Sequence, residues 1–316
     1  MRPDGSEDHE VATGLPGQHI HPDWSSDGRS LVFRADLDFP QLFLIDPVTD
    51  PTGVHARQLT NCADHCDQVD DAALSPADSA VAYVEDRGLV TVDKIEVPTT
   101  FDLRVARITS HGLAHVRTLL RSRTDPLTHV VTELVEPRWS PDGRSLVFWA
   151  DRTDGRTGLV TGTAVFTIRS DGAGLQQVTP WSMSAGEVDW SPDGKRLAFV
   201  THPLILFSLE HVVSNLYTSR PDGSDLRQLT QATSPDDRAT QARWTPDGRL
   251  IYTRVTPKGR GLWLRDSDGG HPTPIAPGGF RTHGDLQPVA DRQNGTITTS
   301  TPGAGGLTWT GHAPRR

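Results

Sequence analysis

The chain lacks the features that mark membrane-spanning and exported proteins. No apolar run approaches the roughly 18 consecutive residues that cross a bilayer, so we expect no membrane insertion. The N-terminal stretch MRPDGSEDHE is polar and has no hydrophobic core, so no signal peptide is predicted. We therefore expect a cytoplasmic protein, or a periplasmic or secreted one if the sequence is that of a mature form.

Positive charge is also scarce. The chain has 31 lysines and arginines against 40 aspartates and glutamates, which gives a net charge of −9. Nucleic-acid binding requires clustered cations that meet the phosphates, so we expect no nucleic-acid partner. The two cysteines are too few to build a disulfide scaffold.

Glycine and proline are plentiful, in contrast, and one phrase repeats. The 29 glycines and 24 prolines indicate frequent turns. The phrase RWSPDGRSLVFWADR begins at Arg138, and close copies begin at Asp23, Asp189 and Arg243. The tryptophan of each copy, or the residue aligned with it, serves as an anchor, and the anchors divide the chain into six units. They are Trp24, Leu74, Trp139, Trp190, Trp244 and Val289.

Each unit predicts four antiparallel strands. The phrase holds the end of one strand, a Pro-Asp-Gly turn that supplies the positive φ of a hairpin, and a second strand of alternating β-formers. Two more strands follow, and a second Asp-Gly turn separates them in most units. A four-stranded antiparallel unit that repeats six times is the pattern of a β-propeller.

The sequence therefore predicts an all-β, six-bladed β-propeller that forms a single domain over residues 1–316. The N-terminal RPDGSEDHEVAT aligns with RPDGSDLRQLT at residues 220–230, which ends a unit. We expect the N-terminal segment to supply the outer strand of the last blade, a 3+1 closure that removes free sheet edges. The predicted blades span residues 19–60, 68–120, 134–180, 186–231, 239–276, and 284–312 with 8–14.

The repeated phrase, with the Asp-Gly and Leu-Thr segment that follows it, resembles the WD40-like PD40 repeat of TolB-like six-bladed propellers. The resemblance covers the whole chain and is weaker in the second and sixth units. Members of this group include envelope scaffolds, propeller domains of prolyl-oligopeptidase-type peptidases and oligogalacturonate-lyase-like enzymes. A fold shared by so many functions does not choose among them.

The first strand of each blade is expected to begin at the mouth of the central channel, three residues before the anchor. Carboxylates and imidazoles that converge there from separate blades would hold a divalent cation such as Mn²⁺, Zn²⁺ or Ca²⁺. The alternative is an ordinary polar channel filled with water. The candidate ring is His21, Asp71, Glu136, Glu187 and His283.

A second metal candidate lies in NCADHCDQVDD, residues 61–71, which connects the first two units. Cys62, His65 and Cys66 could chelate zinc together with Asp70. The Cys-x-x-x-Cys spacing is not specific to zinc, and a local disulfide or two free thiols are equally compatible with it.

The loops on the channel-mouth face are irregular in sequence and are the expected place for a ligand. The apolar insert THPLILFSLEHVVSNLY, from Thr201, is either a hairpin that packs on the disc or a ligand lid. The candidate catalytic residues are His21 and His202 as bases and Arg152 as a clamp for an anion. The candidate ligand-binding residues are Asp151, Arg152, Arg156, Glu210, His211 and Arg254.

Three functions fit these features. The first is a propeller, expected to be a monomer, that binds a small molecule, a peptide or a protein partner at the channel mouth. The second is a metal-assisted lyase or hydrolase that acts on an anionic substrate in the same funnel. The third is a protein-interaction scaffold of an envelope complex. No cofactor other than a divalent cation is expected.

Overall fold

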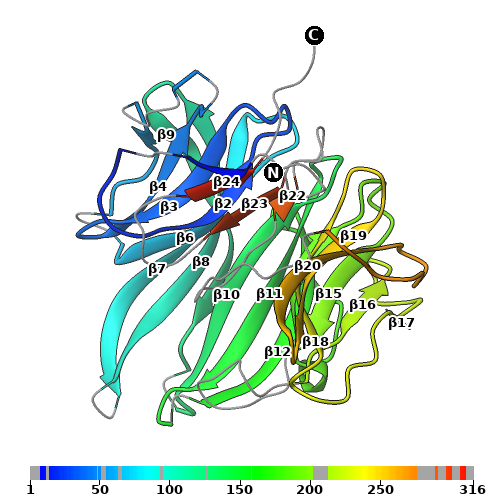
Figure 1. Cartoon of the computed structure of the whole chain (residues 1–316). Coiled ribbons are helices and arrows are strands. Elements are labelled where there is room, and N and C mark those ends of the chain that lie inside the picture. The colour runs from blue at the N-terminus through cyan, green and yellow to red at the C-terminus, as the bar shows by residue number, and fades with distance from the viewer. Residues whose placement is uncertain are drawn as a thin grey trace.

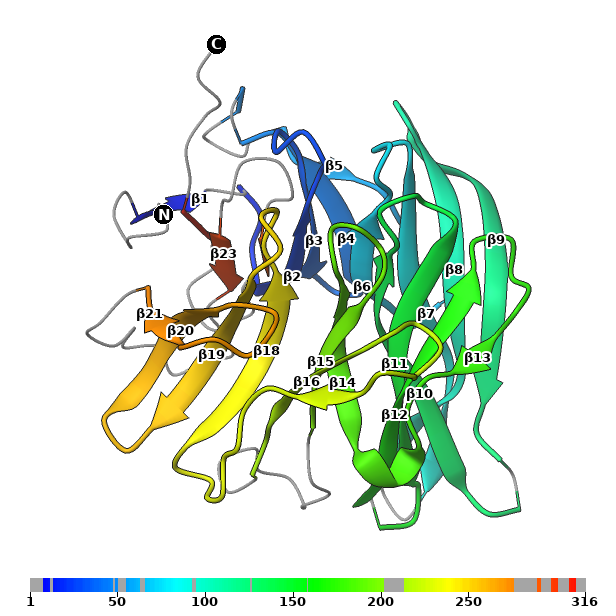
Figure 2. The ribbon, with the colours of Figure 1, turned by 90° about the vertical axis from the view of Figure 1, so that its right-hand side faces the viewer.

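The computed structural model describes twelve stretches of the chain. They are residues 8–11, 14–47, 49–50, 55–62, 66–92, 95–125, 127–157, 159–201, 213–275, 289–290, 297–300 and 307–310. Within them the chain forms antiparallel sheets of four strands, arranged as the blades of a propeller (Figures 1 and 2). The described residues contain no helix that is long and apolar enough to cross a membrane.

Five blades are each built from four strands that follow one another in the chain. Blade one consists of β2 (His19–Trp24), β3 (Leu31–Asp36), β4 (Pro40–Ile45) and β5 (Arg57–Gln58). Blade two consists of β6 (Gln68–Leu74), β7 (Ala80–Val92), β8 (Ile95–Thr109) and β9 (Gly112–Arg123). Blade three consists of β10 (Val130–Trp139), β11 (Ser145–Asp154), β12 (Leu159–Arg169) and β13 (Gln176–Gln177). Blade four consists of β14 (Ala185–Trp190), β15 (Leu197–Thr201), β16 (Leu216–Ser219) and β17 (Arg227–Gln228), and the short 3₁₀ helix η1 (Trp181–Met183) precedes it. Blade five consists of β18 (Arg238–Trp244), β19 (Leu250–Thr256), β20 (Gly259–Arg265) and β21 (Thr273–Pro274).

A sixth, smaller sheet joins the two ends of the described chain. It has the order β1 (Asp8–Val11), β24 (Leu307–Thr310), β23 (Ile297–Ser300) and β22 (Val289–Ala290), and β1 pairs antiparallel with β24. Its strands have two to four residues. The prediction of an all-β propeller with four antiparallel strands in each blade is confirmed, but the described residues form five full blades rather than the six predicted. The last unit has Val289 in place of the anchoring tryptophan and lacks the Pro-Asp-Gly turn. It therefore offers a smaller anchor side chain for packing, and it lacks the turn that stabilises the hairpin in the other units.

The repeated phrase packs one blade against the next. The anchors Trp139 and Trp190 are 5% and 6% exposed. The Trp139 indole donates to the Ala73 carbonyl of blade two, and the Trp190 indole donates to the Arg138 carbonyl of blade three. The turn glycine Gly143 has φ +69°, as the Asp-Gly hairpin requires. The phrase therefore recurs because every blade needs the same anchor and the same turn.

Blade two departs most from the repeat. Its second and third strands form a long hairpin, in which β7 and β8 pair from Ala80–Arg107 to Val92–Ile95. Figure 1 shows these strands extending well past those of blade one. Its fourth strand, β9, has 12 residues, whereas the fourth strands of the other full blades have two. The turn between β8 and β9 lies at residues 110–111.

Candidate functional site

The first strands of the full blades share a β-bulge three residues before the anchor. The ladder between first and second strand shifts register there in all five blades. The bulged residue has a positive φ of 48–56° in each, although none of the five is glycine. A left-handed conformation costs non-glycine residues about 1 kcal/mol or more, and bulges redirect a side chain. The bulged residues are His21, Asp71, Glu136, Glu187 and Gln241.

In blades one and two the bulge brings three ligand atoms together. Nδ1 of His21 lies 2.6 Å from an oxygen of Asp70 and 2.7 Å from Oδ1 of Asp71. His, Cys, Asp and Glu are the usual metal-ligating residues. In the part of the chain that the structure describes, His21, Asp70 and Asp71 are the group of such residues whose ligand atoms lie close enough together to bind one metal ion. The His21 side chain is 26% exposed, so solvent and small ions reach the cluster. Oδ2 of Asp71 accepts a hydrogen bond from the backbone N–H of Glu136 at 2.9 Å, whereas the buried Oδ1 has only the His21 nitrogen beside it and no well-formed hydrogen bond from the described residues.

The three groups strongly perturb one another's ionisation. Burial opposes protonation of His21, but Asp71 and Asp70 outweigh it and raise its pKa well above the usual value. Burial also favours the neutral form of Asp70, yet His21 and Arg34 lower its pKa. Burial and the nearby charge of Asp70 raise the pKa of Asp71. The cluster therefore holds one shared positive charge between two carboxylates.

More carboxylates surround this cluster on blades two and three. Burial, with repulsion from Asp70 and Asp71, raises the pKa of Asp86 to about 7. Glu133 on β10 pairs across the ladder with Asp151 on β11. Burial and repulsion from Asp151 raise the pKa of Glu133 well above its usual value, and burial raises that of Asp151 to about 6. The mouth at blades one to three is thus strongly acidic.

The bulged residues of the later blades are engaged by the ring itself. An oxygen of Glu187 accepts a hydrogen bond from the backbone N–H of Gln241, and Oε2 of Glu136 lies 3.3 Å from Nη2 of Arg243. The nearby Arg243 and Arg138 outweigh burial and lower the pKa of Glu136. Arg138 in turn pairs with Asp23 of blade one at 2.9 Å, so these two charges, each just before an anchor, join blade three to blade one. Of the predicted ring, the structure therefore groups His21 and Asp71 and adds Asp70 to them.

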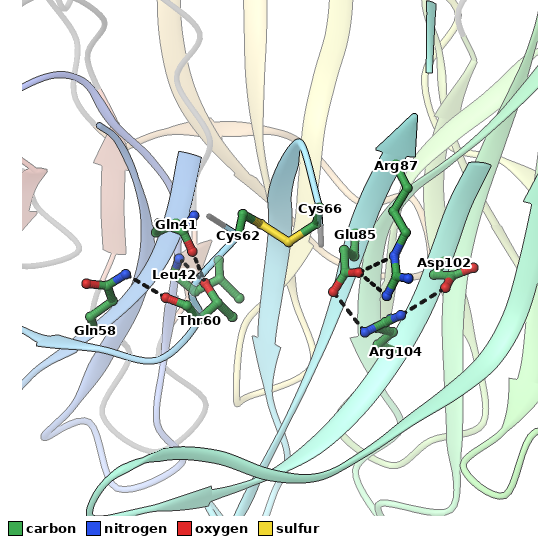
Figure 3. Close-up of a disulfide and its surroundings, with 10 residues drawn as sticks. All are labelled: Gln41, Leu42, Gln58, Thr60, Cys62, Cys66, Glu85, Arg87, Asp102 and Arg104. Atoms are coloured by element: carbon green, nitrogen blue, oxygen red, sulfur yellow. Dashed lines mark hydrogen bonds and ion pairs between the residues drawn. A yellow bond between two sulfur atoms is a disulfide. The ribbon is translucent and has the colours of Figure 1, made fainter. Parts of the chain in front are cut away.

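The zinc interpretation of the cysteine loop is wrong in this structure. Cys62 and Cys66 form a disulfide, so neither sulfur is a thiolate ligand. Figure 3 shows the bridge between blade one, where Thr60 bonds Gln41, and the ion-pair network of Glu85, Arg104 and Asp102 on blade two. Both cysteines pack into the apolar layer between these blades. The disulfide closes the loop that leads into β6, which carries Asp70 and Asp71.

Two of the three arginines predicted to bind an anion already have side-chain partners. Arg152 is exposed, and its guanidinium lies 3.8 Å above the ring of Trp181. Arg254 makes two hydrogen bonds to Asp237, at 2.8 and 2.9 Å, and lies over Trp263. Arg156 is exposed in the turn between β11 and β12. Asp151 belongs to the acidic mouth, on the opposite face of β11 from its neighbour Arg152.

Five candidates lie outside the described residues, and their roles remain predictions. They are His65, His202, Glu210, His211 and His283.

Sequence reasoning missed Asp86 and Glu133, and it placed Asp70 with the cysteines. Glu133 lies three residues before the ring position Glu136 on the same strand, and Asp86 lies on β7. Asp86 and Glu133 come near the cluster of His21, Asp70 and Asp71 because of how the long strands of blades two and three pair. The repeated phrase contains no signal for that pairing. Only Asp70, which immediately precedes a ring residue, could have been added from its position in the sequence.

Comparisons with known proteins agree with the fold. No family model matches the chain. The Tol-Pal system protein TolB of Alcanivorax borkumensis is 35% identical over 83 residues, and dipeptidyl-peptidase 5 of Porphyromonas gingivalis is 32% identical over 79 residues. These matches span 26% and 25% of the chain but only 16% and 11% of the two proteins' own length.

Solved structures resemble nearly the whole chain at low identity. A protein assigned as TolB from Agrobacterium tumefaciens aligns with a TM-score of 0.57 and 15% identity over 95% of this chain and 92% of its own. An oligogalacturonate lyase in complex with manganese aligns with a TM-score of 0.57 and 14% identity, over 94% and 78%. A puromycin hydrolase aligns with a TM-score of 0.60 and 16% identity, over 95% and 47%.

The predicted resemblance to TolB-like propellers is therefore confirmed as a likeness of fold. At such identities the likeness extends to the fold alone.

Proposed function

We propose that the channel mouth binds a divalent cation through His21, Asp70 and Asp71, and that the cation helps to hold a small-molecule or peptide ligand there. The observation that carries this proposal is the approach of two carboxylate oxygens to one imidazole nitrogen, at 2.6 and 2.7 Å. One Nδ1–H cannot satisfy two carboxylates well, and Oδ1 of Asp71 is left without a well-formed hydrogen bond among the described residues, while its Oδ2 binds the backbone N–H of Glu136.

The donor set fits a cation. One imidazole nitrogen with carboxylate oxygens suits Mn²⁺ or Zn²⁺ better than Ca²⁺, which prefers oxygen alone. The surrounding carboxylates add attraction for cations, and they argue against direct binding of an anion by the protein. A bound cation with open positions would supply a Lewis acid that accepts an oxygen of the ligand.

Titration calorimetry of the whole chain with Mn²⁺ tests this proposal. We expect saturable binding with one site, and a loss of affinity of at least about 100-fold in His21→Ala, as for removal of a metal ligand. Glu187→Gln is the matched control, because it changes a bulged residue that stabilises the ring, and its affinity should stay within about twofold. Equal affinity in the chain and in His21→Ala would sink the proposal.

A second candidate function is a metal-assisted lyase or hydrolase. It is favoured by Asp86, whose pKa of about 7 suits a general acid or base at neutral pH. The structural neighbours include a lyase in complex with manganese and a hydrolase. In this candidate the cation would bind the anionic substrate, and Asp86 would move a proton.

The small sixth sheet supports a closed ring. Its strand β22 contacts β18 of blade five and β2 of blade one. We propose that this sheet is the sixth blade and that β1 completes it as the outer strand, the 3+1 closure expected from the sequence. The Cys62–Cys66 disulfide supports a periplasmic or secreted location, where disulfides persist, over the cytoplasm.

A further inference from the structure

The turns between first and second strands lie at the end of the blades opposite to the channel mouth. Each first strand runs from its bulged residue to the anchor, three residues and about 10 Å further on, and then into the turn. A cavity of about 380 Å³ opens at this end, the turn face, between the neighbouring blades four and five. Pro192, Trp244, Pro246 and Gly248 line it, with other residues of the turns. The cavity is therefore separate from the candidate site.

The turns of the preceding blades pack against one another. A Cβ built on Gly143 of blade three would lie 3.8 Å from Cδ of Pro76 in blade two. A Cβ built on Gly194 of blade four would lie 3.6 Å from Cδ of Pro141 in blade three. The equivalent Cβ on Gly248 of blade five would meet no atom of the described residues within 4 Å. The contact between proline and turn glycine that closes two blade interfaces is thus missing from the third.

The anchor of blade five shows the same separation. The indoles of Trp139 and Trp190 each donate to a carbonyl of the preceding blade. The buried Nε1–H of Trp244 has no acceptor among the described residues, although its backbone N–H donates to Asp189 of blade four at 2.9 Å. Blades four and five are therefore joined up to the backbone of the anchor and stand apart beyond it. The indole nitrogen is buried, so it reports this spacing and is not itself a ligand contact.

The gap is not a general property of the repeat. A crevice lined by the same repeat positions in blades one and two, including Trp24 and Pro76, has a volume of about 30 Å³. There the backbone N–H and the hydroxyl of Ser26 donate to Asp78 across the interface, at 2.7 and 2.6 Å. Gly248 stands at the position of Asp78 in blade five and has no side chain to reach blade four.

We infer that this cavity is a binding site for a peptide segment that contains proline. The closed interfaces of the same chain indicate which group fits here, because a prolyl ring packs against the turn glycine in each of them. The ligand's ring lies on Gly248, between Pro192 and Pro246. Grooves lined by aromatic side chains bind proline-rich peptides in the polyproline II conformation, which is preformed and costs little entropy to fix. The site does not depend on the proposed cation.

The charged residues at the rim of the cavity are already matched. Asp193 and Asp247 are about half exposed, and each pairs with a cation of its own turn. Arg196 pairs with Asp225 of its own blade at 2.5 Å. An uncharged segment therefore suits the cavity better than an acidic or a basic one.

Two blocked, uncharged decapeptides test this inference on the whole chain, with EDTA present to keep the cation site empty. One is oligoproline, and the other alternates glycine and serine. By calorimetry or by NMR of the tryptophan indole signals we expect saturable binding of oligoproline, at least about tenfold tighter than that of the control peptide. Burial of two methylene groups of one ring corresponds to a gain of about this size. Equal affinity for the two peptides, or oligoproline that does not saturate, overturns the inference.

A pair of variants places the peptide at the cavity. Ser267 lines it, so the bulk of Ser267→Tyr should fill the cavity and weaken oligoproline at least about tenfold. Ser170→Tyr is the matched control, because Ser170 also directly precedes the Asp-Gly turn of its blade but does not line the cavity. Its affinity should stay within about twofold. An unchanged affinity in Ser267→Tyr excludes this site. If that variant fails to fold, the two peptides on the unaltered chain still decide.

Discussion

Blades one and two and blades four and five place a bulged residue at the same point of the first strand, yet they use it differently. In blades one and two, His21 and Asp71 meet at an accessible cluster, and the other oxygen of Asp71 accepts a hydrogen bond from the backbone N–H of Glu136 in blade three. In blades four and five, the carboxylate of Glu187 accepts the corresponding hydrogen bond from the backbone N–H of Gln241. The bulged carboxylate thus joins neighbouring blades on both sides of the ring, and only Asp71 also belongs to the candidate site.

The difference comes from the neighbours of the bulge. Asp70, immediately before Asp71, turns one side into a cluster with more acids than bases, and Asp86 and Glu133 add to it. On the other side Arg243 and Arg138 neutralise the channel carboxylates. A repeat position is therefore a candidate for ligand binding where charge is left unbalanced, whereas balanced charge leaves it a structural part of the ring.

The sixth sheet is proposed to close the ring, so we expect the largest loss of stability when this sheet is opened. A chain without residues 1–11 lacks β1 and leaves β24 as a free edge. We expect it to lose about 4 kcal/mol of stability, roughly 1 kcal/mol for each residue of the lost strand, and to aggregate more readily. Urea unfolding measures the change, and a chain without residues 1–7 is the control. Equal stability of the two shortened chains would argue against closure by β1.

The acidic side should be destabilised by its own charge at neutral pH. Folding raises the pKa of Asp86 from 3.8 to about 7, chiefly through burial. The folded chain then keeps a proton that the unfolded chain has lost, so this group's contribution to stability falls as pH rises from about 4 to about 7. Asp86→Asn should match the parent near pH 4 and exceed it by about 4 kcal/mol at pH 8.

Asp237, which directly precedes β18 of blade five, is the matched control for that measurement. Its pKa is lowered by hydrogen bonds from Arg254, so its contribution is present above the unfolded pKa and is lost as pH falls. Asp237→Asn should therefore destabilise the chain at pH 8, by less than about 1 kcal/mol because the carboxylate is half exposed. If Asp86→Asn and Asp237→Asn both raised, or both lowered, the stability of the chain at pH 8, the directions assigned to the two pKa shifts would be contradicted.

An effect between those of Asp86→Asn and Asp237→Asn is expected at the carboxylate of Glu187, which joins blades four and five. Glu187→Ala leaves the Gln241 N–H without that acceptor and should cost about 1–3 kcal/mol. Glu187→Gln keeps an amide oxygen and should cost less. Adding Mn²⁺ should not change the difference between the two variants in urea unfolding. We expect Mn²⁺ to stabilise Glu187→Ala as much as it stabilises the unaltered chain, because Glu187 is not a proposed ligand.

The repeat was enough to predict the blades, since each phrase combines a buried anchor, a turn and a strand whose signals are local. It predicted less where the phrase decays. Val289 lies in a sheet of short strands. In blade two, β7 and β8 form a long hairpin whose length the repeat does not predict. The site could be predicted only by alignment to the anchors, which is why His21 and Asp71 were found and Asp86 was not.

The sequence alone determined the propeller architecture, the positions of the anchors and the bulged residues before them, because these depend on contacts that recur at a regular spacing. Only the tertiary structure decided that His21 meets both Asp70 and Asp71, and that Asp71 and Glu187 each bind the backbone of the next blade. It also paired Cys62 with Cys66 and left a cavity between Pro192 and Gly248. Those outcomes depend on side chains that meet across blades, where distance along the chain carries no information about distance in space.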